Sequence, residues 1–280
     1  MNLFFLQLRG ELSKMFARKR TYIGFGAYFA LEVLVLLLFQ IPKVQRGFGR
    51  TIERFGGLGE QYFSGLTLAL IMVMVTFILT MLYVALIGGD VVAKEVEDGT
   101  MRMTLCRPIS RLRLVILKYC ACLIYTFALI FFVGISALLT GILRYGTGGL
   151  FVMALEQRLF AFYDFNEGLM RYGAALFFYS LSFLCITTFA FMLSCFNMKP
   201  AAATIISLSV FIVDWILFHL PYFESIRDWF VTRNMESWIK VFTGRIPWGT
   251  IIENYTYLMA LNATFVIIAA MRFQQRDFKS

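Results

Sequence analysis

The chain has 280 residues, of which 60% are hydrophobic and only 15% charged, and its mean hydropathy is +0.74. A soluble domain is nearer half apolar and a quarter charged, so this composition excludes an ordinary soluble fold and indicates a polytopic α-helical membrane protein. The apolar runs are about 20 residues long and do not alternate, which argues against a β-barrel. The net charge of +9 is typical of loops that set membrane topology, so no nucleic acid partner is expected.

Residues 1–20 are predicted to form an amphipathic helix. Apolar side chains recur at helical spacing, with charged residues between them and a basic run at Arg18, Lys19 and Arg20. We expect this helix to lie in the inner interface with its basic face toward lipid headgroups; the alternative is a plain cytoplasmic extension of the first span. A long apolar run follows without a small-residue cleavage site, so a secretory signal peptide is not expected.

Six transmembrane helices are predicted, in an all-α fold that forms a single domain over residues 1–280. Each is long enough to cross roughly 30 Å of hydrocarbon at about 1.5 Å per residue. The predicted spans are approximately residues 21–40, 66–87, 114–139, 172–196, 201–220 and 251–271. Six spans place both termini on one side of the membrane. The segments 41–65, 140–171 and 221–250 then lie on the other side, where we expect short interfacial helices.

The distribution of lysine and arginine predicts which side is which. The segments on the side of the termini carry 15 of the 26 Lys and Arg residues, and the opposite segments carry 11. By the positive-inside rule, both termini are predicted to be cytoplasmic, in a bacterial plasma (inner) membrane.

The sequence contains no motif for nucleotide binding or catalysis. There is no GxxxxGK[ST] phosphate loop, no HExxH and no CxxC, and His219 is the one histidine. We therefore expect no enzymatic activity, cofactor or metal in this chain. None of the five cysteines falls in a predicted outer segment, so no disulfide is expected.

The longest polar interruption between two apolar runs is the segment 88–118, near the middle of the chain. Gly88 and Gly89 are expected to end the second span, and Gly99 and Pro108 to break the helix again. Ser110 is predicted to cap the helix that follows. The segment is therefore predicted to form two short helices at the membrane surface with flexible corners. The alternative is a solvated loop that only sets topology.

The sequence of this segment, GGDVVAKEVEDGTMRMTLCRPISRLRLVILK, resembles the signature of ABC-2 type transporter permeases. The final stretch, with Arg276, Asp277 and Phe278, resembles the usual ending of that family. One departure is Cys106, where leucine-like residues are commoner. The matching positions in the segment are Glu95, Glu97, Asp98, Gly99, Thr100, Leu105, Pro108, Ser110, Arg111 and Lys118.

The resemblance implies the membrane-spanning permease subunit of an ABC exporter. It implies pairing with a second copy or a paralogue, and two separate ATPase subunits that hold ATP and Mg. The coupling loop 88–113 would dock on an ATPase, with Thr100 capping its second helix and the N-terminal helix as another candidate contact. The docking residues implied are Glu95, Glu97, Asp98, Gly99, Thr100, Arg102, Arg107, Pro108, Ser110 and Arg111.

Two acidic residues lie inside predicted spans, Glu32 near the middle of the first and Asp214 in the outer half of the fifth. Ionisable groups at that depth are costly and usually face a bundle interior or water. They indicate either a polar path or proton-linked switch, or hydrogen bonds that hold helices together. Two rival functions follow: a gradient-driven secondary transporter that uses these acids, and a non-transporting membrane scaffold for an ATPase.

Overall fold

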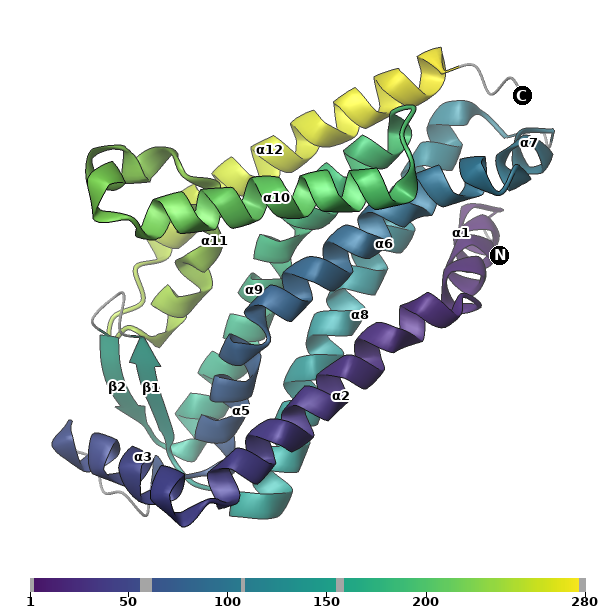
Figure 1. Cartoon of the computed structure of the whole chain (residues 1–280). Helices are drawn as coiled ribbons and strands as arrows, with labels where there is room; N and C mark the ends of the chain where they lie inside the picture. Colours follow the sequence, from purple (N-terminus) through teal and green to yellow (C-terminus); the bar gives the residue numbers. More distant parts are fainter. Residues whose placement is uncertain (1–2, 56–61, 107–108, 155–158, 277–280) are drawn as a thin grey trace.

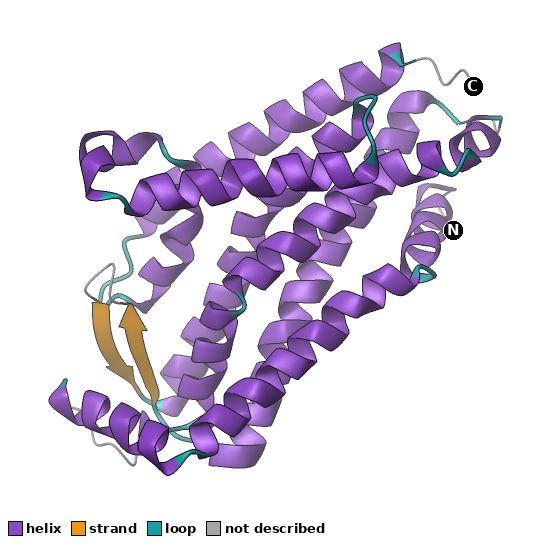
Figure 2. Cartoon of the chain, viewed as in Figure 1, coloured by secondary structure: helices purple, strands orange, loops and turns teal. Residues whose placement is uncertain are grey.

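The computed structural model describes residues 3–55, 62–106, 109–154 and 159–276, and it is a helical bundle with one small β-hairpin (Figures 1 and 2). Within these residues, six helices are long and apolar enough to cross a membrane, which confirms the predicted number of spans. They are α2 (Lys19–Gln40), α6 (Phe77–Glu97), α8 (Arg111–Tyr145), α9 (Phe165–Cys195), α10 (Pro200–His219) and α12 (Trp248–Gln275).

The predicted second span consists of two helices, α5 (Gly65–Val75) and α6, which are separated at Thr76. The Thr76 hydroxyl donates to the carbonyl of Val73 at 2.8 Å, a local bond that competes with continuation of the helix. The prediction that Gly88 and Gly89 end this span is wrong, because α6 continues through both of them to Glu97.

The two glycines are sites of close helix packing. A Cβ atom on Gly88 would lie 2.6 Å from the backbone oxygen of Thr187 in α9, and one on Gly89 would lie 2.7 Å from the hydroxyl of Thr204 in α10. Small residues let helix backbones approach closely in membrane proteins. The glycine pair therefore joins α6 to two neighbouring helices instead of ending it.

The β-hairpin contradicts the expectation of an all-α fold. Strands β1 (Leu150–Ala154) and β2 (Leu159–Tyr163) pair antiparallel, with Leu150 opposite Tyr163. Both strands are apolar runs of five residues, too short for a stable helix, and aromatic cross-strand pairs favour sheet pairing. The rings of Phe151 and Phe162 stack with their centroids 5.0 Å apart.

The other two outer segments contain short helices, as predicted. Helix α3 (Pro42–Arg54) follows α2, and η1 (Pro221–Trp229), α11 (Val231–Met235) and η2 (Glu236–Phe242) lie between α10 and α12. These elements and the hairpin lie away from the end of the molecule where both chain termini, α1 (Leu3–Phe16) and α7 (Thr100–Leu105) are found (Figure 1). The shared location of the termini agrees with an even number of spans.

Candidate functional site

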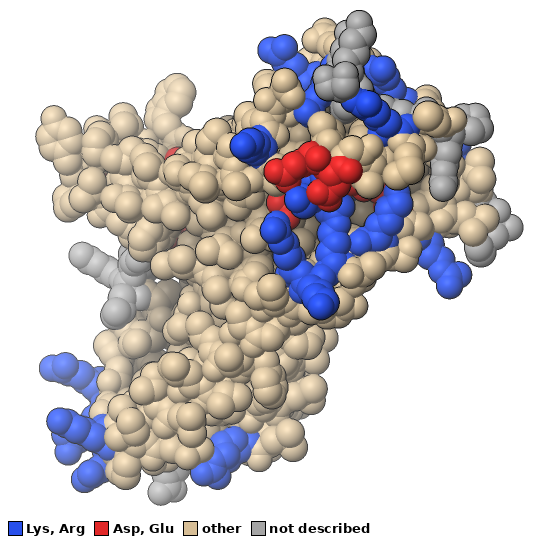
Figure 3. All heavy atoms as spheres, turned by 45° about the vertical axis from the view of Figure 1, so that its right-hand side comes forward, with Lys and Arg blue, Asp and Glu red and all other residues tan. Residues whose placement is uncertain are grey.

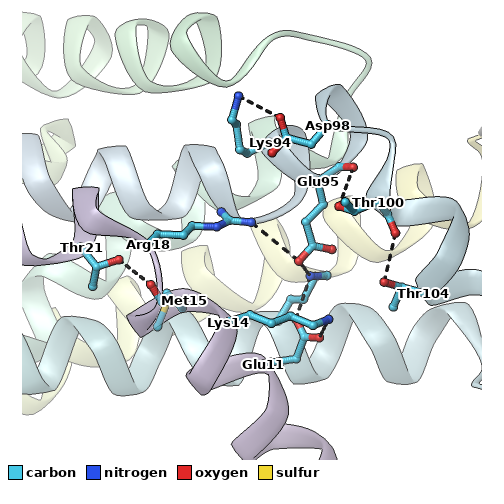
Figure 4. A network of polar contacts seen from close by, with 11 residues as sticks. Glu11, Lys14, Met15, Arg18, Thr21, Lys94, Glu95, Asp98, Thr100 and Thr104 are labelled. Carbon is cyan, nitrogen blue, oxygen red and sulfur yellow. Dashed lines mark hydrogen bonds and ion pairs between the residues drawn. The ribbon is translucent and has the colours of Figure 1, made fainter.

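The coupling segment folds as a corner between α6 and α7, and residues 97–104 are called the elbow below. Gly99 follows the last turn of α6 in the left-handed conformation, with φ of 71°, which favours glycine at a helix end. The Thr100 hydroxyl donates back to the carbonyl of Glu95 at 3.2 Å, so it satisfies the end of α6 (Figure 4). The prediction that Thr100 caps the second helix is therefore wrong: α7 has no side-chain cap.

The start of α8 is capped as predicted. The Ser110 hydroxyl accepts a hydrogen bond from the backbone N–H of Arg113 at 3.3 Å. The neighbouring Arg111 guanidinium donates to the backbone carbonyls of Gln274 and Arg276, both at 2.9 Å. Arg111 thus satisfies carbonyls at the end of α12 and ties that helix to the start of α8.

A buried ion-pair cluster lies beneath the elbow and joins three helices. The Lys118 side chain, in α8, has no exposed surface, and its Nζ lies 2.7 Å from Oε1 of Glu95 in α6 and 2.8 Å from Oε2 of Glu11 in α1. Lys14 also contacts Glu11 at 2.7 Å, and Arg18 approaches Glu95 at 3.9 Å. Figure 4 shows how Glu11, Lys14 and Arg18, at the corner where α1 meets α2 (residues 11–18), lie close to Glu95 in the last turns of α6.

The charges in the cluster depend on one another. A buried ammonium group without a partner would cost several kcal/mol, so Lys118 needs both carboxylates close by. Although burial raises the pKa of the Glu11 carboxyl, the charges and hydrogen bonds of Lys118 and Lys14 outweigh it and hold that pKa below its usual 4.5. At neutral pH the cluster therefore keeps Glu11 ionised and α1 attached to α8.

Glu95 is thereby separated from the docking surface that the resemblance implies. Its side chain is 7% exposed and faces Lys118, whereas those of Glu97 and Asp98 are 45% and 47% exposed. Lys94 contacts both of the exposed acids, at 2.7 and 3.1 Å. The space-filling view shows acidic side chains surrounded by basic ones at this end of the molecule (Figure 3).

The other implied docking residues that the structure describes are all exposed. Gly99, Thr100, Arg102 and Ser110 are exposed, and Arg111 is exposed but bound to the end of α12. Arg107 and Pro108 lie outside the described residues. Met103, which was not among the expected docking residues, is 68% exposed and is the most exposed apolar side chain of the elbow.

An open groove of about 480 Å³ separates the elbow from the corner of α1 and α2. Its walls combine basic groups from the corner with acidic, hydroxyl and thioether groups from the elbow. The lining residues are Lys14, Ala17, Arg18, Glu95, Asp98, Thr100, Met103 and Thr104. Glu95 belongs both to the buried cluster and to the lining of the groove, so the cluster stabilises one wall of the groove.

The two acids inside the spans form hydrogen bonds between elements. Asp214 accepts from the backbone N–H and the hydroxyl of Thr232 at 2.8 and 2.6 Å, so it caps α11 and holds it to α10. Glu32 is fully buried and accepts from the Ser136 hydroxyl at 2.6 Å, which links α2 to α8. Among the described residues, the second oxygen of Glu32 has no hydrogen-bond partner.

Sequence reasoning missed the role of Glu11 and its pairing with Lys118. Glu11 is the one acid among residues 1–20, on a helix otherwise rich in basic and apolar residues. That isolation was the available signal, since an acid on a basic helix suggests a specific cation partner. The partner lies 107 residues away in sequence, and no local pattern pairs the two.

The fold and this site define a multi-pass helical membrane protein with a charged corner at the end that holds both termini. The chain belongs to the family described as "Protein of unknown function (DUF2705)", whose match covers residues 33–279. It is also similar to the "Uncharacterized protein YhcI" of Bacillus subtilis (strain 168), with 30% identity over 118 residues. That match covers 42% of this chain and 38% of the length of the relative.

Proposed function

We propose that this chain is the membrane-spanning permease subunit of an ABC exporter of the ABC-2 type, and that a separate ATPase subunit docks on the elbow. The observation that carries the proposal is the pairing of an exposed, charged elbow with a buried cluster directly beneath it. A loop that only connects two spans needs neither feature. The resemblance of the segment 88–118 to ABC-2 permeases supports the same assignment.

The contacts of the elbow suggest how movement of a partner reaches the spans. Gly99 allows α7 to change its angle to α6, whereas Glu95 is held to α8 and α1 through Lys118. A force on the elbow therefore acts on α6, α8 and α1 together. Helix α6 transmits this force into the bundle as far as the break at Thr76, where the helix begins.

In this proposal, the partner ATPase binds ATP and Mg and performs hydrolysis, and this chain supplies the path for the substrate. Two permease chains, identical or paralogous, combine with two ATPase subunits in a bacterial plasma membrane. The elbow and both termini face the cytoplasm. Charge complementarity between the elbow and its partner would set specificity and the rate of association.

The test is co-purification of the full chain with a separately encoded ABC ATPase subunit from the same organism. Glu97→Arg inverts one exposed charge of the elbow, and we expect it to reduce recovery of the ATPase at least fivefold. Glu224→Arg is the matched control, because Glu224 is an exposed acid in η1, far from the elbow. Undiminished ATPase binding after residues 97–104 are replaced by a Gly/Ser linker would refute the proposal.

A second candidate, a gradient-driven transporter, is favoured by one observation: the buried carboxyl of Glu32 has an oxygen without a hydrogen-bond partner among the described residues. Such a group inside a span is suited to binding and releasing a proton. Substrate movement in proteoliposomes that requires a proton gradient and no ATP, and that is lost in Glu32→Gln, would favour this candidate.

A further inference from the structure

Helix α3 lies where the chain leaves the hydrocarbon at the end of the molecule opposite the termini. The apolar helix α2 continues to Gln40, one residue makes the turn, and α3 begins at Pro42. Figure 1 shows α3 turned away from the direction of α2 and lying across that end of the bundle. A helix that starts within two residues of the end of a span, and turns, stays at the depth of the lipid headgroups.

The apolar face of α3 is occupied by the protein itself. Ile52 is completely buried, and the ring of Phe48 contacts those of Phe39 and Phe63 with centroids 5.5 and 6.0 Å apart. Phe55, directly after the helix, stacks on Phe160 of the hairpin at 3.8 Å. These contacts fix the rotation of α3, so the opposite face has a defined direction.

That opposite face carries a basic stripe, defined as Lys43, Arg46, Arg50 and Arg54. The spacings of three, four and four residues place the four side chains in one row along the helix, and all four residues are exposed. In the part of the chain that the structure describes, none of them forms an ion pair. Figure 3 shows basic side chains gathered at this end of the molecule as well as around the elbow.

We propose that the basic stripe of α3 binds the phosphate groups of anionic phospholipid headgroups in the leaflet at this end. Guanidinium groups form paired hydrogen bonds with phosphate oxygens, and three of the four stripe residues are arginines. Each Lys or Arg near a membrane surface strengthens attraction to anionic lipid by roughly fivefold. Because the apolar face anchors α3 to the hairpin and to α2, bound headgroups would hold the whole outer end at a fixed depth.

The experiment is photocrosslinking of the full chain in bilayers of phosphatidylglycerol and phosphatidylcholine. A trace of phosphatidylglycerol with a photoreactive headgroup is added, and crosslinked peptides are identified by mass spectrometry. We expect crosslinks to residues 42–54 that fall at least tenfold in the variant R46Q/R50Q/R54Q. The control variant R9Q/K19Q/K199Q removes three exposed charges from other elements and leaves crosslinking of α3 unchanged.

Two further measurements decide between headgroups and other anions. A phosphatidylcholine probe with the same reactive group is expected to crosslink α3 at least fivefold less, and equal labelling by the two probes overturns the proposal. Inorganic phosphate should compete no better than sodium chloride of matched ionic strength. Specific competition by phosphate would assign the stripe to a soluble anion instead. The substitutions lie on an exposed face, so an unchanged thermal unfolding midpoint verifies that the variants are folded.

Discussion

The buried cluster makes a quantitative prediction for Lys118→Met. This change keeps most of the side-chain volume but leaves the carboxylates of Glu11 and Glu95 buried without their shared cation. Removing one partner of a buried ion pair typically costs about 3–5 kcal/mol. Lys14 and Arg18 remain near the two acids, so we expect the lower end, about 3 kcal/mol of unfolding free energy.

Lys94→Met is the matched control. Lys94 also contacts two carboxylates, at 2.7 and 3.1 Å, but those of Glu97 and Asp98 are nearly half exposed. Exposed ion pairs contribute little because water and salt screen them. The two lysines therefore have similar contact distances and differ in burial, so the comparison isolates the effect of desolvation.

The assay is unfolding in mixed micelles titrated with sodium dodecyl sulfate, followed by circular dichroism. Trypsin cleavage after Lys19, the first residue of α2, is a local readout of whether the corner between α1 and α2 stays attached. Lys118→Met should lower the midpoint clearly, speed the cleavage and be partly rescued by adding Glu11→Gln and Glu95→Gln. Lys94→Met should stay close to wild type. Equal effects of the two lysine substitutions would refute the reasoning.

Three further predictions follow from contacts in the same structure. Gly88→Ala should destabilise the protein by roughly 2 kcal/mol, because the added Cβ would meet the backbone of α9 at 2.6 Å. Thermal unfolding measures this effect, and the control Gly10→Ala, whose Cβ would meet nothing within 4 Å, should be neutral or stabilising. Asp214→Ala should lower the unfolding free energy by about 1–2 kcal/mol and speed hydrogen exchange at the amide of Thr232, because the cap of α11 is lost, whereas Asp214→Asn should retain part of the cap. Unchanged exchange in Asp214→Ala would show that the cap contributes nothing. Folding lowers the pKa of Glu11, so ionised Glu11 stabilises the fold fully above about pH 4.5, and this stabilisation is lost as the pH falls through the lowered pKa. Trypsin does not cleave at that pH, so the release of α1 is followed by pepsin cleavage. Release of α1 that is identical in Glu11→Gln would contradict this assignment.

The number of membrane-length helices could be predicted from the sequence because the length of an apolar run reports directly on the thickness of the bilayer. Five of the six predicted spans match a single observed helix to within one residue of its end or lie inside it, whereas the second is divided at Thr76. Helix α8 extends beyond both predicted ends, and α9 begins well before its predicted start. Hydropathy marks only the part of a helix inside the hydrocarbon. Their 35 and 31 residues exceed the roughly 20 needed to cross it, so charged residues such as Arg111 and Arg144 of α8 and Glu167 of α9 lie in helical ends outside the apolar stretch.

The errors arose where tertiary contacts override local preference. Gly88 and Gly89 resemble a helix end in sequence, yet they are the positions where α6 touches α9 and α10. Likewise, the charged stretch around Glu95 gave no indication that one acid faces inward, since its partner Lys118 lies on the next span. The motif drew attention to this segment of the chain, and only the structure separates its buried residues from its exposed ones.

The most direct test of the central claim is the sidedness of Cys106, which follows α7 and is exposed, whereas Cys122, Cys185 and Cys195 are buried and Cys120 is half-buried. A membrane-impermeant maleimide is applied to intact cells and to inverted membrane vesicles, with Cys106→Ser as the control. If the elbow faces the cytoplasm and is open to an ATPase, Cys106 reacts in the vesicles and stays unlabelled in the cells. Labelling of Cys106 on intact cells would contradict this account.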